Sequence, residues 1–336
     1  MTVDATLASA SNVLVYSAMT VYAGALAAFA TDLSGLGRTT RPQVLERELV
    51  TTTPPRDHAL PRDHALRRDQ GLHAREGAVA PPRRRAASIA VSLTWLAFFV
   101  HAGAVVLRGL SAHRVPWGNM YEFSVTGAVV VTGVFLALLL RRDLRYLGTF
   151  VVGPVLLTLG LAVVVLYTES AQLVPALQSY WLVIHVSVAF VASALLTIAF
   201  SATVLQLVQQ RREQARAAGN PARRGRFMEG LPGSAELERA GYRLVAIAFP
   251  LWTFTLVAGA IWAERAWGRY WGWDPKEVWT FVIWVVYAAY LHARATRGWD
   301  GRRAAYLSLA GYVCVLINFL VVNVFFSGQH SYAGIG

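Results

Sequence analysis

The sequence is poor in cysteine and in charge for a chain of its length. Its 336 residues include one cysteine, Cys314, and only 15% of them are charged, whereas 55% are hydrophobic. A single cysteine can form neither an internal disulfide nor a CxxC redox pair, so any thiol chemistry must come from a partner. The shortage of charge excludes an ordinary soluble domain, because so many apolar side chains need contact with lipid.

Long apolar stretches recur along the whole chain. A helix needs roughly 20 residues to cross a hydrocarbon core of about 30 Å. No stretch alternates like a membrane β-strand, and the first one lacks the basic flank and cleavage site of a removable signal peptide. We therefore expect an all-α, polytopic membrane protein with about eight transmembrane helices. They are expected at residues 11–30, 88–108, 122–140, 146–168, 180–208, 243–262, 278–296 and 304–326.

Positive charge is distributed unevenly among the predicted loops. Of 31 Lys and Arg residues, 26 lie in the segments 31–87, 141–145, 209–243 and 294–303. By the positive-inside rule these segments are cytoplasmic, so both termini are external. The net charge of +12 then reflects topology and attraction to lipid headgroups rather than a nucleic-acid partner. The remaining cations are Arg108, Arg114, Arg265, Arg269 and Lys276.

The segment 31–87 differs in composition from the rest of the chain. It is rich in Arg, Pro and Asp and contains RDHAL twice, at 56–60 and 62–66, which predicts a disordered cytoplasmic linker. Its three histidines lack apolar surroundings, so a solvated linker is favoured over a metal site; they are His58, His64 and His73. The predicted organisation is a first transmembrane helix within 1–30, this linker, and a seven-helix domain over 88–336 with a cytoplasmic loop at 209–242.

A tryptophan-rich segment, residues 262–279, lies between the sixth and seventh predicted helices. Its sequence, WAERAWGRYWGWDPKEVW, holds six large aromatic residues: Trp262, Trp267, Tyr270, Trp271, Trp273 and Trp279. An interfacial aromatic belt accounts for part of this density. Gly268 and Gly272 separate the rings, however, and would let the backbone lie flat and present indole faces to a broad planar ligand.

Within this segment, DPKE is the pattern of a helix start. Asp274 is the expected cap, Pro275 the first helical residue, and Glu277 can reach back to the cap. We therefore assign Asp274 and Glu277 to architecture before direct ligand contact. The nearby cations could pair with ligand carboxylates or extend to the membrane interface, and both interpretations stay open; they are Arg265, Arg269 and Lys276.

Two histidines are expected beside the tryptophan-rich segment. His185 lies near the start of the fifth predicted helix and His330 follows the eighth, so both belong at the outer surface. A lone histidine there is usually a satisfied polar residue, but two imidazoles on one aromatic shelf are the ligands that six-coordinate haem iron requires.

The other histidines at or near the spans are not expected to join this pair. His292 and His101 lie inside spans, where ionisable groups tend to mark function. Helix geometry puts His292 roughly 21 Å below the outer surface and His101 roughly 20 Å above the inner one. One haem could not easily bind both; His292 is expected to pair with a histidine of another subunit, and the role of His101 stays open. For His113 we expect local hydrogen bonding rather than ligand contact.

These residues resemble a family, the haem-handling membrane proteins of cytochrome c biogenesis called CcsA, CcsB or ResC. The segment WGRYWGWDPKEVW looks like the WWD motif of that family. Four other stretches accompany it in order, and the resemblance covers the chain from about residue 90 onward. They are PWGNMYEF at 116–123, LVPALQSYWLVIHVS at 173–187, YLHAR at 290–294 and GQHSYAG at 328–334.

The resemblance implies a site and a task. Haem b would lie against the WWD motif on the outer face of the cell membrane, with His185 and His330 as axial ligands. His292 would bind iron at a second, inner site with a histidine of a ResB or Ccs1-type partner. The chain would act as a subunit of a cytochrome c synthase, presenting haem to the CxxCH motif of an apocytochrome c kept reduced by a thioredoxin-like protein. The residues expected to surround haem include Trp267, Gly268, Tyr270, Trp271, Trp273, Asp274 and Trp279.

Other functions fit parts of the pattern. A transporter of small or lipid-linked solutes could carry the same aromatics as an interfacial belt, in which case His185 and His330 would be dispensable separately. The CcmC and CcmF branch of haem-handling proteins shares the WWD segment, but chain length and the VPALQS and GQHSY stretches favour the Ccs type. The chain has no evident nucleophile, acid pair or phosphate loop, so its catalysis would consist mainly of positioning.

Overall fold

The computed structural model describes residues 3–35, 85–172, 177–219, 228 and 230–330, and over these residues it contains helices and connecting turns but no strand. Eight of its helices are long and apolar enough to cross a membrane, which confirms the predicted fold class. A short 3₁₀ turn, η1 (Arg145–Leu147), precedes α4, and a π-helical turn, Ile317–Val321, separates α8 from α9. The helices are α1 (Ala5–Gly35), α2 (Arg85–Ser111), α3 (Met120–Leu139), α4 (Gly148–Val164), α5 (Tyr180–Ala217), α6 (Ser234–Trp267), α7 (Pro275–Arg297), α8 (Gly301–Leu316) and α9 (Val322–Phe325).

Several helix ends differ from the predicted ones. Helix α1 continues to Gly35 and α2 begins at Arg85, so both ends of the predicted linker 31–87 are helical. Residues 36–84, with the RDHAL repeats and their histidines, lie outside the described residues. The expected loop 209–242 is shorter, because α5 runs on to Ala217 and α6 already begins at Ser234. Arginine-rich helix ends can extend into water, which a search for apolar windows misses.

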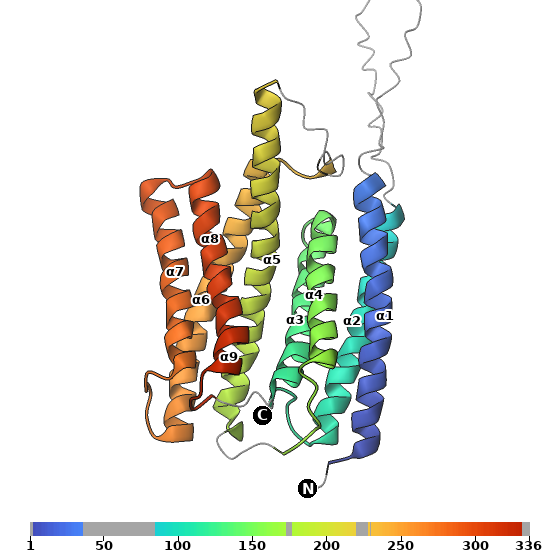
Figure 1. Ribbon diagram of the computed structural model, residues 1–336, viewed down its shortest axis with the longest axis vertical. Helices are drawn as coiled ribbons and strands as arrows, with labels where there is room; N and C mark the ends of the chain where they lie inside the picture. The colour runs from blue at the N-terminus through green and yellow to red at the C-terminus, as the bar shows by residue number, and fades with distance from the viewer. Residues whose placement is uncertain (1–2, 36–84, 173–176, 220–227, 229, 331–336) are drawn as a thin grey trace, which may run out of the picture.

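The helices form two bundles (Figure 1). Helices α1 to α4 pack together as the first bundle, and α5 to α9 form the second. The two bundles meet where α3 and α4 contact α5. The contact of α1 with α2 uses small residues, because Ala90, Ala97 and Ala104 recur every seventh position and are fully buried. Small side chains let membrane helices approach closely, so this spacing explains why the first helix packs against the second.

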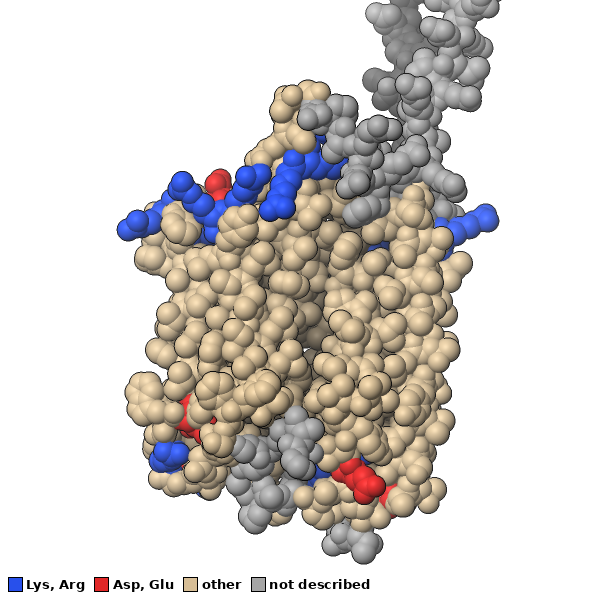
Figure 2. Space-filling model, in the orientation of Figure 1, with Lys and Arg blue, Asp and Glu red and all other residues tan. Residues whose placement is uncertain are grey.

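The two ends of the bundle differ in charge. Figure 2 shows Lys and Arg gathered at one end, here called the arginine-rich end. The connection from α6 to α7, with the tryptophan-rich segment, lies at the other end, where α1 also begins (Figure 1). This asymmetry matches the predicted loop pattern. Exposed arginines at the arginine-rich end are Arg85, Arg141, Arg142, Arg211, Arg216, Arg239, Arg243, Arg297, Arg302 and Arg303.

A buried ion-pair network fixes the connection between α2 and α3 at the tryptophan-rich end. Glu122, only 1% exposed, accepts hydrogen bonds from Arg108 at 3.0 Å and from Arg114 at 2.6 Å. It also accepts from the backbone N–H of Gly118 at 2.9 Å, while Asn119 caps the helix by accepting from the N–H of Glu122. Two of the cations at this end are therefore engaged inside the protein, and residues 115–119 are held in place.

Candidate functional site

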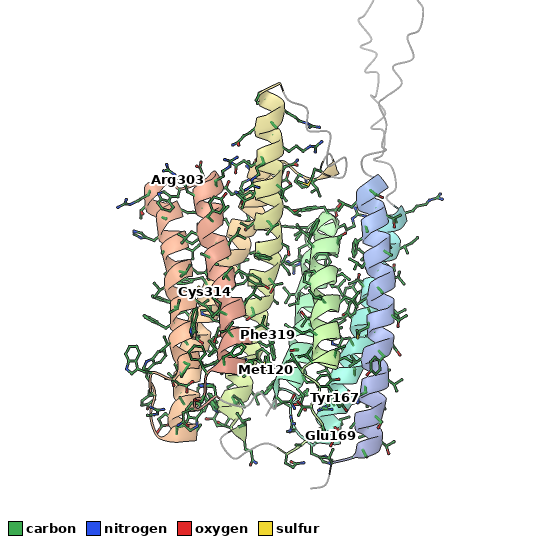
Figure 3. All side chains as sticks on the ribbon, in the orientation of Figure 1. Met120, Tyr167, Glu169, Arg303, Cys314 and Phe319 are labelled. Carbon is green, nitrogen blue, oxygen red and sulfur yellow. The ribbon has the colours of Figure 1, made fainter. Side chains whose placement is uncertain are left out.

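A cavity of about 360 Å³ lies between the two bundles. Its walls come from α3 and α4 on one side and from α5, α6 and the α8–α9 segment on the other. Figure 3 labels Met120 of α3 and Phe319 of the π-helical turn, which both line it. Much of the wall is aromatic. The volume of the cavity lies within the range of about 300–1,000 Å³ that is usual for sites of small ligands and cofactors. Aromatic lining residues are Trp117, Phe123, Phe190, Trp252, Trp262, Tyr270, Trp271, Tyr312 and Phe319.

His185 lines this cavity from the second turn of α5. Its Nδ1 lies 2.9 Å from the carbonyl oxygen of Thr255 on α6, so Nδ1 carries the proton and donates. The ring lies nearly parallel to the indole of Trp262, with centroids 6.0 Å apart and planes at 13°. A Cβ at position 259 would lie 2.7 Å from Cε1 of this imidazole, so Gly259 is the residue that lets α6 approach His185.

His330 reaches the same cavity from the C-terminal segment. Its Nδ1 lies 2.8 Å from Oδ2 of Asp274, and the N–H of Gln329 donates to Oδ1 of the same carboxylate at 2.6 Å. Its ring lies edge-on to Trp262 and Trp267, at centroid distances of 5.4 and 4.9 Å. Both predicted iron ligands therefore contact one indole, that of Trp262, which is only 2% exposed.

Asp274 also begins α7. Its side chain accepts from the N–H of Lys276 while Glu277 accepts from the N–H of Asp274, and Pro275 is the first helical residue, which confirms the predicted helix start. Burial by itself would raise the pKa of the Asp274 carboxyl, but the hydrogen bond and charge of His330 and the N–H donors outweigh it, and the pKa falls below its usual 3.8. This group is therefore an anion that orients His330.

The tryptophan-rich segment divides between the cavity and the surface. Trp262, Tyr270 and Trp271 line the cavity, and Trp267 contacts His330. Trp273 is 73% exposed and has a left-handed backbone conformation, with φ of 58°. Trp279 is half-buried on α7 and does not line the cavity.

The two glycines of the segment have roles other than the flat backbone expected from the sequence. Gly268 ends α6 in the left-handed conformation, with φ of 70°, and its N–H donates to the backbone carbonyl of Glu264. That conformation is open to glycine at little cost and turns the chain toward α7. Gly272 instead donates its N–H to Glu277, which ties the segment to the first turn of α7.

The three cations considered as ligand contacts lie in different surroundings. The side chain of Arg265 is 61% exposed beside Glu264, and that of Arg269 lies on the surface and donates to the carbonyl of Gly272. Lys276 lines the cavity. The structure therefore separates one cavity cation from two surface cations.

The other histidines lie away from this site. His292 is exposed on α7, toward the arginine-rich end of that helix. His101 is fully buried among α1, α2 and α3, where Nδ1 lies 3.4 Å from the hydroxyl of Tyr22, and it does not line the cavity. His113 is exposed in the turn after α2. His101 is thus enclosed by the first bundle, with its Nε2 buried and without a hydrogen-bond partner among the described residues.

Several site residues escape prediction from sequence. Thr255 contributes a backbone carbonyl and Gly259 contributes the absence of a side chain, and neither has a sequence signal until the packing of α5 on α6 is known. Trp117 and Phe123 lie in PWGNMYEF, a stretch that could have identified them as cavity residues. Pro154 and Val155 of α4 line the opposite wall, and no motif in the sequence marks them as cavity residues.

The donor set fits haem iron. Each imidazole is held through Nδ1, which leaves Nε2 as the atom able to bind a metal. Metal-binding histidines usually donate their other N–H to a carboxylate or a backbone carbonyl, and the two rings have one partner of each kind. Imidazole is one of the side chains that hold haem iron in proteins.

The sequence is similar to proteins of cytochrome c assembly. The sequence matches the cytochrome c assembly protein family over residues 117–330. The cytochrome c biogenesis protein CcsA of Prochlorococcus marinus is 37% identical over 253 residues, which cover 68% of this chain and 78% of that protein. CcsA of Synechocystis sp. is 33% identical over 274 residues, with 67% and 82% covered.

A solved structure has a similar fold. The cytochrome c haem lyase CcmF matches with a TM-score of 0.57 and 16% sequence identity. The match covers 100% of this chain and 49% of CcmF, so this chain spans about half the length of that protein. At this identity the likeness concerns the fold alone.

Proposed function

Because this chain belongs to the cytochrome c assembly protein family, we propose that it binds haem b between His185 and His330 and presents it to an apocytochrome c. Its family makes it a multi-pass membrane protein of cytochrome c maturation. One observation carries the proposed site: two imidazoles from distant parts of the sequence contact the same indole, Trp262, at one aromatic cavity.

The residues of the site would act by positioning. His185 and His330 would hold the haem iron through Nε2, and the Asp274 carboxylate would make His330 the more basic ligand. The two imidazoles would keep oxygen from the iron, and the bound haem would supply the vinyl groups for attachment. Each cysteine thiol of CxxCH would add across one vinyl group, sulfur bonding one carbon and hydrogen the other, so no oxidant would be consumed. His185 and His330 would hold the haem in place for this addition and release it with the product.

The membrane orientation follows from charge. With the arginine-rich end in the cytoplasm and among lipid headgroups, the tryptophan-rich segment and both termini face outward. Exposed Tyr270 and Trp273 then border the side from which an apocytochrome approaches. A thioredoxin-like protein would keep the cysteines of that apocytochrome reduced, since this chain has only Cys314.

A ResB or Ccs1-type partner is proposed to cover α7. His292 shares an exposed face of this helix with Phe281 and Val285, and an imidazole on an apolar membrane face is costly without a partner. A histidine of the partner would share a second haem with it. Replacing His292 with alanine should remove a partner-dependent haem and spare the first; loss of both, or of neither, would contradict this assignment.

The test of the proposed function is the haem content of purified protein. We expect a bis-histidine absorbance spectrum for the wild type, alone or with its partner, and at least tenfold less haem for His185→Ala and for His330→Ala. His113→Ala is the matched control, because His113 is exposed at the same end and outside the cavity. Unchanged haem in both ligand variants, with folding intact, would reject the ligand roles and favour a transporter.

A further inference from the structure

Lys276 is the one Lys or Arg among the described residues that line the cavity. It lies in the first turn of α7, two residues after the cap that orients His330. It borders the main cavity and also a small pocket between α7 and the C-terminal segment. A positive charge therefore faces the region where the two imidazoles converge.

Two neutral oxygens hold this ammonium group. Nζ of Lys276 donates to the backbone carbonyl of Asn318 at 3.0 Å and to the side-chain oxygen of Asn323 at 2.6 Å. Asn318 lies in the π-helical turn Ile317–Val321, where the usual hydrogen-bond spacing of a helix is changed. Such turns often occur at functional sites, and here the turn presents a carbonyl to a side chain of another helix.

No carboxylate of the described residues forms a salt bridge with Lys276. The nearest in sequence accept from other donors: Asp274 from Gln329 and His330, and Oε2 of Glu277 from the N–H groups of Gly272 and Asp274. Glu277 also lines the cavity, and its Oε1 is buried and accepts no hydrogen bond from the described part of the chain. Glu277 is also the next residue along the helix, and neighbours in sequence do not face each other on a helix. A partly buried ammonium that donates only to neutral oxygens is costly, and an anion from a ligand would compensate for it.

A further polar atom lies at this wall without a partner. Oδ1 of Asn318 is buried and accepts no hydrogen bond, while its Nδ2 donates to Thr280 at 3.4 Å. The rest of the cavity is lined largely by apolar and aromatic side chains. Lys276, Asn318 and Asn323 thus form a polar corner in an apolar cavity.

We propose that this polar corner is a carboxylate-recognition site, in which Lys276 pairs with a propionate of the haem that the cavity takes up. The inference rests on the proposed function and names the group that fixes how haem is turned within the cavity. Arg265 and Arg269 have no such part, because their side chains lie on the surface. The pairing would select porphyrins that carry free carboxylates.

The experiment compares haem with haem dimethyl ester, whose propionates are blocked. Both are titrated into purified, haem-free protein in detergent, and the absorbance gives two dissociation constants. A charge-assisted hydrogen bond predicts that wild-type protein binds haem about tenfold or more tightly than the ester. Lys276→Gln should bring the two constants together, and Asn323→Ala should reduce the preference with α7 left unchanged. Arg269→Gln, the surface control, should keep the wild-type preference.

The possible failures are distinguishable. Wild-type protein that binds both porphyrins equally, or Lys276→Gln protein that keeps the full preference, overturns the carboxylate site and leaves the histidine pair untouched. Wild-type protein that binds neither porphyrin contradicts the proposed function itself. The wild-type comparison needs no variant, so a variant that fails to fold does not remove the test.

Discussion

Asp274 is the residue through which the start of α7 holds His330. It accepts from Lys276 N–H as a helix cap and from Gln329 and His330 as an anchor. Asparagine is an equally good cap, but its amide nitrogen cannot accept a hydrogen bond. We expect Asp274→Asn to fold normally and to bind haem about 10–100-fold more weakly, as for other partners of metal-binding histidines. Haem titration of the purified variant measures this.

The control for this prediction is Asp300→Asn. Asp300 precedes α8 at the arginine-rich end, is exposed, and makes no side-chain hydrogen bond to the helix start. Its replacement should leave haem affinity unchanged. An Asp274→Asn protein with wild-type affinity would mean that His330 is oriented by something other than this carboxylate.

Gly259 offers a second test at the residue scale. A methyl group there would meet the His185 ring at 2.7 Å, so alanine must displace the imidazole from its place between α5 and α6. We expect Gly259→Ala to lower haem occupancy at least tenfold and to shift the spectrum away from bis-histidine ligation. Gly160→Ala is the matched control, since nothing lies within 4 Å of a Cβ at that helical position. Equal spectra for both variants would contradict the placement of His185.

At the residue scale, the sequence predicts a site residue only where its side chain has a recognisable chemical role. That His185 and His330 lie at the same end of the molecule was predictable, because it follows from the order of the apolar spans. The second role of Asp274 was not, since a cap explains the residue completely until the C-terminal segment is placed beside it. Gly259 lacks a side chain to predict from, and its importance comes from the packing of α5 against α6.

At the scale of elements, the connection between α2 and α3 is stabilised by one carboxylate, that of Glu122. Glu122 is buried with Arg108 and Arg114, whose side chains are 4% and 8% exposed. Glu122→Gln would leave two buried cations without a counter-charge, which costs about 3–5 kcal/mol. The thermal midpoint of the purified protein should fall accordingly. Asp143→Asn, which breaks an exposed ion pair with Arg145, should change stability by less than about 1 kcal/mol.

The outcome that would contradict this prediction is equal stability of the two variants. In that case Glu122 would not anchor residues 115–119, and the placement of Trp117 and Gly118 on the cavity wall would need another cause.

At the scale of helices, apolar windows predicted every span but few ends. Helices α5 and α6 pass beyond their apolar parts, because arginine and glutamate are good helix formers in water. The π-helical turn at Ile317–Val321 was not foreseen either. Nothing in an apolar run distinguishes one hydrogen-bond spacing from another, and here the turn coincides with contacts from Lys276 on another helix.

The whole molecule has two ends of different charge, and its orientation can be tested directly. In a Cys314→Ser background, a cysteine at Arg265 or at Asp300 places one thiol at each end. A membrane-impermeant maleimide should label the first in intact spheroplasts and the second only after permeabilisation. The reverse pattern would put the tryptophan-rich segment in the cytoplasm and contradict the proposed route to apocytochrome.

The arrangement of the two bundles decides where the cavity lies, and the sequence did not predict it. Apolar spans indicate that helices cross the membrane but not which of them are neighbours. The α3 and α4 walls of the cavity, with Phe123 and Pro154, come from helices that carry none of the proposed iron ligands.

The most direct measurement is an experimental structure of the haem-loaded protein at a resolution that shows the iron ligands. We expect iron bound by Nε2 of His185 and Nε2 of His330, with the porphyrin in the cavity beside Trp262. Iron held by any other pair of residues, or haem bound outside this cavity, would contradict it.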